Sequence, residues 1–226
     1  MRQDNYAGGI VPGLSRSRRI ELVTLFLAFS FASLSRAQDV LTYHNDNART
    51  GQNLNETILT PSNLNATQFG KVLQVSVDGK VDAQPLYASA VAIPGQGTHD
   101  VLFVATEHDS VYAFDADTGT QLWQVSLLQR GKTPSDDRGC SQVTPEVGIT
   151  ATPVIDRSSG PNGTIYVVAM SKDSSSAYHQ RLHALDMTAG TEAFGAPKEV
   201  QATFPGTGDN SNGTDVIFDP AQYAVA

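Results

Sequence analysis

The feature that most constrains the fold is an eleven-residue segment that occurs twice. Residues 113–123 (AFDADTGTQLW) align with residues 184–194 (ALDMTAGTEAF), at a constant shift of 71 positions. The two copies share Ala, Asp, Gly and Thr at equivalent positions, and each ends on an aromatic residue. A segment that returns in this way is typical of repeat architectures, in which one small unit stacks on the next. We therefore expect two units of the same plan.

Two further matches lie upstream of this segment. Residues 102–105 (LFVA) correspond to residues 165–168 (IYVV) with a shift of 63, and residues 83–86 (AQPL) correspond to residues 151–154 (ATPV) with a shift of 68. Because the shifts differ, the insertions must lie in loops between corresponding strands.

Each unit is expected to contain four short strands, because short runs of β-branched and aromatic residues alternate with clusters of Gly, Pro, Asn, Asp and Ser. The expected strands are 83–90, 101–106, 110–115 and 121–128 in the first unit, and 150–156, 164–170, 180–186 and 193–203 in the second. No segment after residue 37 shows a sustained helical period. Four antiparallel strands that repeat at this spacing indicate an all-β protein and are typical of propeller blades.

Residues 115–119 (DADTG) predict the turn between the third and fourth strands. The glycine supplies a positive φ, and the Asp and Thr side chains bond the turn backbone. Calcium binding by Asp115 and Asp117 is disfavoured, because a five-residue turn offers too few oxygens. Trp123 is expected to pack on the neighbouring unit with its indole N–H on a turn carbonyl. The residues expected to dock one unit on the next are Ala113, Asp115, Thr118, Gly119, Trp123, Ala184, Asp186, Gly190 and Phe194.

Residues 111–123 (VYAFDADTGTQLW) resemble the tryptophan-docking repeat of the pyrroloquinoline-quinone-type β-propellers, whose pattern is Ala-x-Asp-x-x-Thr-Gly-x-x-x-Trp. The first copy matches every fixed position, whereas the second has Ala189 for Thr and Phe194 for Trp. Residues 43–51 (YHNDNARTG) are similar to the stretch that opens many such propellers. Residues 69–77 (FGKVLQVSV) resemble an outer strand that, in this family, closes the ring by joining the last blade.

The resemblance implies a partial propeller of four-stranded antiparallel blades. The expected parts are a signal peptide at 1–37, a lead-in at 38–68, an outer strand at 69–77, blades at 83–128 and 150–203, and the start of a further blade at 215–226. Two blades cannot close a ring. We therefore expect that the chain is truncated at its C-terminus.

The first residues carry the pattern of a secretory signal. Arg16, Arg18 and Arg19 precede an uncharged apolar run at 22–34, and residues 35–37 (SRA) form a small-x-small cleavage site. The apolar run is shorter than the roughly 20 residues that a membrane-spanning helix needs. We expect cleavage after Ala37 and a secreted or periplasmic product without a membrane span.

Charge and cysteine content exclude several classes of function. Without residues 1–37 the chain has 10 basic and 21 acidic residues. Such a surface repels phosphate backbones and anionic headgroups, so nucleic acid is not an expected partner. A single cysteine, Cys140, excludes an internal disulfide and a cysteine-based zinc site.

Candidate ligand-binding residues lie in the loops that a four-stranded blade places on one face, after its second and fourth strands. They are Glu107, His108, Asp109, Glu146, Lys172, Asp173 and His179. Glu107, His108 and Asp109 can form an acid/base pair or half of a metal site. The interpretation we prefer is a polar hairpin loop, because no second ligand follows at a defined spacing. The connection 129–148 also has the length of a functional loop.

Two functions fit these observations. The first is a non-catalytic binding or scaffold module that takes a protein or saccharide partner, with no cofactor or metal. The alternative is the N-terminal portion of a quinone-dependent dehydrogenase of alcohols or sugars. In that family, the resemblance implies, an adjacent Cys–Cys disulfide, a Trp floor, calcium held by Glu, Asn and Asp, and an Asp base serve the pyrroloquinoline quinone. This sequence has no Cys–Cys pair, and Trp123 occupies the docking position. Whether the protein is an enzyme stays open.

Overall fold

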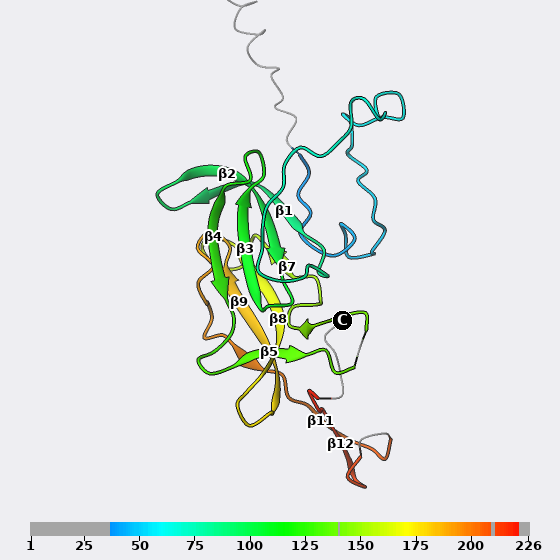
Figure 1. Ribbon diagram of the computed structural model, residues 1–226, viewed down its shortest axis with the longest axis vertical. Coiled ribbons are helices and arrows are strands. Elements are labelled where there is room, and N and C mark those ends of the chain that lie inside the picture. The colour runs from blue at the N-terminus through cyan, green and yellow to red at the C-terminus, as the bar shows by residue number, and fades with distance from the viewer. Residues whose placement is uncertain (1–36, 140, 209–210, 222–226) are drawn as a thin grey trace, which may run out of the picture. The chain divides into compact units, whose positions relative to one another are not determined.

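The computed structural model describes residues 37–139, 141–208 and 211–221. The predicted signal peptide, apart from Ala37, and Cys140 lie outside the described residues. Within the described ranges every regular element is a strand, so the prediction of an all-β protein is confirmed. No helix in this part of the chain is long and apolar enough to cross a bilayer. The sheets are antiparallel (Figure 1).

The first sheet contains β1 (Leu86–Ile93), β2 (Gly97–Ala105), β3 (Ser110–Asp115) and β4 (Gln121–Ser126), in that spatial order. Its strands follow those expected for the first unit. The main differences are that β1 begins three residues later than expected and continues to Ile93, and that β2 begins four residues earlier than expected. β4 ends two residues earlier than expected. A register shift between Ala88 and Val91 interrupts its pairing with β2, and Ala90 has a φ of 50° there.

The second sheet is built around a long hairpin. β8 (Thr164–Lys172) and β9 (Tyr178–Asp186) pair along their whole length, β7 (Val154–Asp156) pairs with β8, and β10 (Lys198–Glu199) pairs with β9. The fourth strand expected at 193–203 is reduced to β10 and an isolated bridge between Leu185 and Glu192. The physical reason is that Phe194 and Gly195 both have positive φ, which turns the chain out of the sheet.

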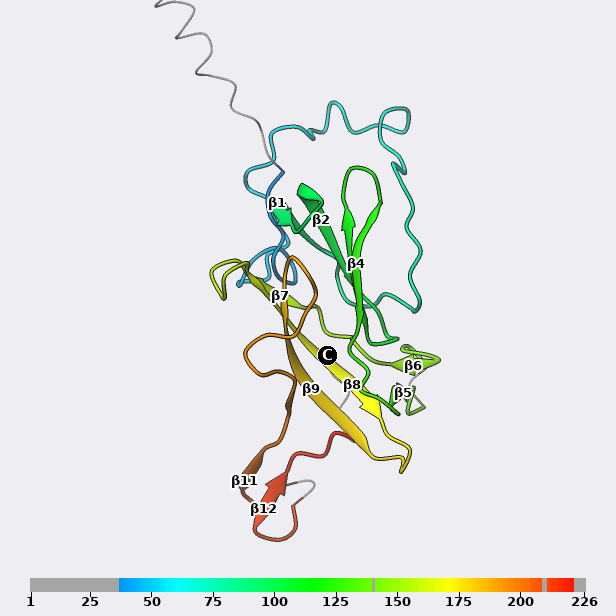
Figure 2. The same ribbon diagram turned by 90° about the vertical axis from the view of Figure 1, so that its left-hand side faces the viewer.

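Two short pairings were not expected from the sequence (Figure 2). In the connection between the sheets, β5 (Thr133–Asp136) pairs with β6 (Glu146–Val147) and also with the end of β8. Near the end of the described chain, β11 (Thr203–Pro205) pairs with β12 (Asp215–Ile217). The further blade expected from residue 215 is thus represented, in the described residues, by one short strand of a two-stranded ladder.

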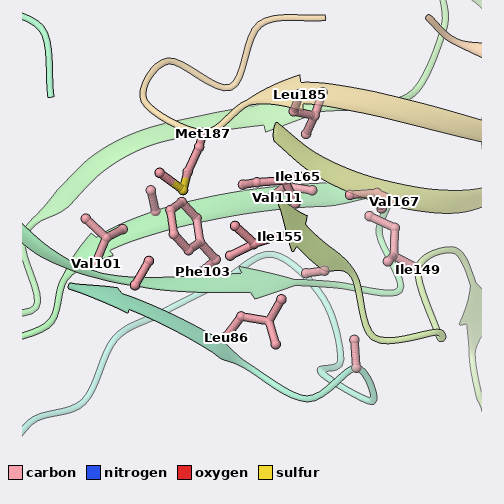
Figure 3. Packing of buried hydrophobic residues seen from close by; sticks show 14 of the residues in the cluster. Leu86, Val101, Phe103, Val111, Ile149, Ile155, Ile165, Val167, Leu185 and Met187 are labelled. Carbon is pink, nitrogen blue, oxygen red and sulfur yellow. The ribbon is translucent and has the colours of Figure 1, made fainter. Parts of the chain in front are cut away.

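The hydrophobic core lies between the two sheets (Figure 3). Alternate residues of β2, such as Val101 and Phe103, face Ile165 and Val167 of β8, and these side chains are almost fully buried. On its other face the first sheet carries a second cluster of Val104, Tyr112 and Phe114, against which Val75 and Val77 pack. Both faces of the first sheet are therefore covered.

The covering segment is the expected outer strand at 69–77. It is extended but belongs to no ladder among the described residues. Leu73 and Val75 nevertheless lie against Gly119, where a methyl group would meet Val75 Cγ1 at 3.3 Å. The segment is therefore held by side-chain packing on the turn after β3.

The turns after β3 and β9 have the same construction. Asp115 Oδ1 accepts the N–H groups of the residues two and three positions later, and Asp186 Oδ1 does the same. The hydroxyl donor differs by one position, since it is Thr118 in the first turn and Thr188 in the second. Gly119 and Gly190 have φ of 74° and 67°. The conserved plan of the two units thus extends to the hydrogen bonds of the turn.

Trp123 lies on the second of these turns. A Cβ on Gly190 would come within 2.8 Å of Trp123 Cε3, and the indole also contacts Phe103 at 5.8 Å between ring centroids. The expected bond from the indole N–H to a turn carbonyl is wrong, since Nε1 is buried without a partner among the described residues. Phe194, its counterpart, is 61% exposed and lies beside Gly160 of its own sheet.

The lead-in joins the first strands of both sheets. Val40 forms a two-way bridge with Tyr87 of β1, and the Leu41 carbonyl accepts the Ile155 N–H of β7 at 2.8 Å. The Asp39 carboxylate accepts from the Ser89 N–H and from the Arg157 guanidinium, at 2.7 and 2.6 Å. One extended segment therefore holds the two sheets together at their β1 and β7 edges.

Candidate functional site

Glu107 and Asp109 lie in the loop between β2 and β3, at the junction of the two sheets. They are 0% and 1% exposed, although the sequence gives them the appearance of a polar hairpin loop. Glu107 Oε2 accepts the Gly148 N–H at 2.7 Å and the Thr150 hydroxyl at 3.0 Å. The Glu107 N–H donates to the Lys80 carbonyl. The loop is thus fixed between the segments that lead into β1 and β7.

The two buried carboxyl groups have unusual proton affinities. Burial, followed by the charge of Glu107, raises the pKa of Asp109 to about 9. Burial also raises the pKa of Glu107, and the Gly148 N–H acts in the opposite direction. Both Asp109 oxygens and Glu107 Oε1 are without hydrogen-bond partners in the described part of the chain. Asp109 is therefore protonated in the folded protein at neutral pH.

Gly148 is required by this arrangement. A Cβ there would lie 2.2 Å from the Glu107 carbonyl oxygen and 2.7 Å from Asp109 Oδ1, which no side chain tolerates. Among the described residues no group of three or more His, Cys, Asp and Glu side chains is placed to hold a metal ion. Because both carboxyl groups are buried, a change in their protonation affects the packing between the two sheets.

The remaining loop residues form an ionic network that spans both sheets. His108 Nδ1 lies 2.9 Å from Glu146 Oε1, and Glu146 is the cross-strand neighbour of Asp136 in the β5–β6 pair. Asp136 accepts from Lys172 Nζ at 2.5 Å and from the Tyr178 hydroxyl at 3.0 Å. The structure thus places the His108–Glu146 pair beside the Lys172–Asp136 pair, on neighbouring strands of a hairpin that the sequence did not indicate.

The other two predicted residues lie at the β8–β9 turn, where Asp173 directly follows β8 and His179 is the second residue of β9. His179 Nε2 is 3.1 Å from Asp173 Oδ2, and His179 Nδ1 is 2.8 Å from Glu199 Oε1. Hydrogen bonds from Ser175 and then from His179 hold the pKa of Asp173 well below its usual range. The guanidinium of Arg138 stacks on the Tyr178 ring, 4.6 Å from its centroid. These contacts lie within the second sheet and its loops, next to the Lys172–Asp136 pair.

The side chains present do not fit a pyrroloquinoline quinone. The single Trp of the chain is engaged with Gly190 and cannot serve as the floor of a cofactor site, and the single Cys cannot make the implied disulfide.

Sequence reasoning missed the loop at 43–51 as a site. His44, Asn45 and Gly51 line a pocket beside β1 together with Gln84. The signal that was available is the density of Asn, Asp and Gly, residues that favour left-handed backbone.

The described residues define an all-β protein with a four-stranded sheet, a six-stranded sheet and a two-stranded ladder, in which polar loops lie beside the first two sheets. No family model, no curated protein and no solved structure matches the chain.

Proposed function

We propose that the chain is part of an exported β-propeller of the pyrroloquinoline-quinone-like repeat class, and that it acts as a non-catalytic binding or scaffold module. The loops on one face would hold a protein or saccharide partner. The sequence resemblance and the packing of the two sheets together support this proposal.

The proposal of a propeller is supported by the same kind of packing at the two equivalent turns. Gly119 is covered by Leu73 and Val75 of the preceding segment, and the equivalent Gly190 is covered by Trp123 of the preceding sheet. The corresponding outer face of the second sheet carries Val154 and Leu182, which are 41% and 39% exposed. A further sheet stacked there would continue the same series.

The binding part rests on one observation: loops from both sheets meet in the network from His108 through Glu146 and Asp136 to Lys172. A surface built from two repeats on a rigid scaffold is the usual arrangement of binding loops. It presents several exposed charged groups, among them Arg138.

The first test addresses catalysis. The purified chain is titrated with pyrroloquinoline quinone in the presence of calcium and assayed for dye-linked oxidation of alcohols and sugars. We expect neither saturable uptake nor oxidation. Saturable micromolar uptake with turnover would replace this proposal by the dehydrogenase alternative.

The second test addresses the surface. Secreted proteins and immobilised polysaccharides are screened for binding, and each interaction is remeasured with Lys172→Ala and with the control Lys71→Ala, which lies on the segment behind the first sheet. We expect binding that weakens only in the Lys172 variant. Equal binding by both variants would show that the loop network is not the contact surface.

A further inference from the structure

The lead-in loop, residues 43–51, has a strained but well-held backbone. His44, Asn45 and Arg49 have φ of 53°, 71° and 59°. Left-handed backbone costs free energy at such residues, and it persists where the surroundings determine it. Here the Arg49 guanidinium donates to the Thr42 hydroxyl and to the Tyr43 carbonyl, at 2.7 and 2.8 Å. These hydrogen bonds therefore hold the loop in one defined conformation.

A pocket of about 480 Å³ lies beside this loop. It is lined by Gln38, Val40, His44, Asn45, Gly51, Asn53 and Gln84. Carboxamides are the commonest side chains in this set, and it contains no carboxylate, ammonium or guanidinium group. Carboxamides donate and accept hydrogen bonds without carrying charge. The lining therefore matches a neutral ligand with many hydrogen-bonding groups.

Hydrogen bonds fix how two of these carboxamides face the pocket. Gln84 Oε1 accepts the His44 N–H at 3.0 Å, so its amide nitrogen is left as a donor with no acceptor among the described residues. Asn45 Nδ2 donates to the Gln52 carbonyl, and Asn45 Oδ1 is buried without a partner in the described part of the chain. The Gln84 amide is thus the donor that a ligand in the pocket can reach, because Asn45 Oδ1 is shielded from solvent.

We infer that this pocket binds a neutral saccharide, whose hydroxyl groups would accept from the Gln84 amide. A charged ligand would lack a counter-charge among the lining residues, and an apolar ligand would meet Val40 as the one aliphatic side chain of the lining. The His44 imidazole, stacked on the Tyr43 ring with centroids 3.8 Å apart, offers a flat surface for the C–H face of a sugar. This inference goes beyond the proposed loop surface around Lys172, because it places a saccharide site at the lead-in loop.

The test uses isothermal titration of the secreted chain with maltohexaose, cellohexaose and chitohexaose, and with an alginate hexasaccharide as the charged comparison. The diagnostic variant is Gln84→Glu, which keeps the acceptor for the His44 N–H and replaces the free donor. The matched control is Gln74→Glu, which makes the same change on the segment behind the first sheet. Both variants must keep the melting temperature of the parent chain.

We expect one of the neutral hexasaccharides to bind saturably. Gln84→Glu should weaken that binding by about tenfold or more, and Gln74→Glu should leave it unchanged. The inference is overturned by the absence of heat from all three neutral probes at about 10 mM, by binding of the alginate probe alone, or by equal binding of the two variants. If the two variants bind equally but Lys172→Ala weakens binding, the proposed function still holds. The saccharide then binds at the loop surface around Lys172 and not at this pocket.

Discussion

Asp109 shows at the level of a single residue how burial can make a charge unfavourable. Its pKa is raised to about 9 in the folded chain, against an ordinary value near 4 in the unfolded chain. The folded state therefore holds this proton more tightly than the unfolded state. The resulting stabilisation is complete below about pH 4 and is lost progressively as the pH rises toward about 9.

The corresponding prediction concerns Asp109→Asn. Asparagine accepts the left-handed backbone of this position, where φ is 57°, and it has no proton to lose. We expect the variant to exceed the parent in stability at pH 8 by on the order of 2 kcal/mol, with little difference near pH 4. Urea denaturation across this pH range measures the effect.

Asp117→Asn, on an exposed turn, is the control and should change stability by less than about 0.5 kcal/mol. A loss of stability in Asp109→Asn at pH 8 would mean that the carboxylate is ionised and paired.

Gly190 and Gly119 offer a matched pair for the contact made by Trp123. Both have positive φ in equivalent turns, but a Cβ would come within 2.8 Å of the indole at Gly190 and within 3.3 Å of Val75 at Gly119. Gly119→Ala should cost about 1 kcal/mol, mainly from backbone strain. Gly190→Ala should cost about 1 to 3 kcal/mol more, because the rigid ring must move.

Chemical denaturation compares the two variants, and Trp123 fluorescence reports whether the indole environment has changed in each. Equal losses at the two glycines would show that the indole does not rest on the second turn.

At the level of the elements, local patterns predicted the first sheet well and the second sheet in part. The strand residues of β2 and β3 are rich in Val and Phe, and their alternation matches the two buried faces. The strand expected at 193–203 failed because its composition gives no sign of the positive φ at Phe194. β5 was missed because its sequence, Thr-Pro-Ser-Asp, is typical of a turn and is held in place by pairing with β8.

The role of the candidate site residues stays a prediction. The rule that places loops on one face named His108, Glu146 and Lys172, which the structure places in the pairs His108–Glu146 and Lys172–Asp136. The burial of Glu107 depends on Gly148 and Thr150, which are distant in sequence and belong to the next unit. No local pattern carries that information, because the contact exists only when both sheets are packed.

The contacts of the lead-in allow a prediction about how the two sheets are joined. The Asp39 carboxylate pairs with Arg157 at 2.6 Å, and the two side chains are 24% and 35% exposed. We expect Asp39→Asn and Arg157→Gln each to destabilise the chain. A double-mutant cycle should give a coupling energy of about 0.5 to 1 kcal/mol, given the partial exposure.

Lys80 and Asp82, which pair at 2.9 Å within one segment, provide the comparison cycle. A lead-in coupling energy of zero would indicate that the sheets are held by apolar packing alone.

For the whole molecule, the prediction that remains to be tested is export. The basic residues, the apolar run and the small-x-small site at 35–37 agree with one another. Expression in a secreting host should release a product that begins at Gln38. Intact-mass measurement decides the matter, and a cytoplasmic chain that retains Met1 would contradict the signal-peptide prediction.

The bond between Asp39 and Arg157 also has a consequence for the timing of folding, because it joins residues 118 positions apart. Contacts between such distant residues must overcome a large loop-closure entropy and slow the folding of a chain. During synthesis the lead-in emerges first, yet its partners on β7 emerge only after the whole first sheet. The beginning of the chain can therefore dock on Tyr87 and Ser89 of the first sheet, but its bonds to Ile155 and Arg157 form only when the second sheet is present. A chain that ended before Ile155 would lack this second set of contacts.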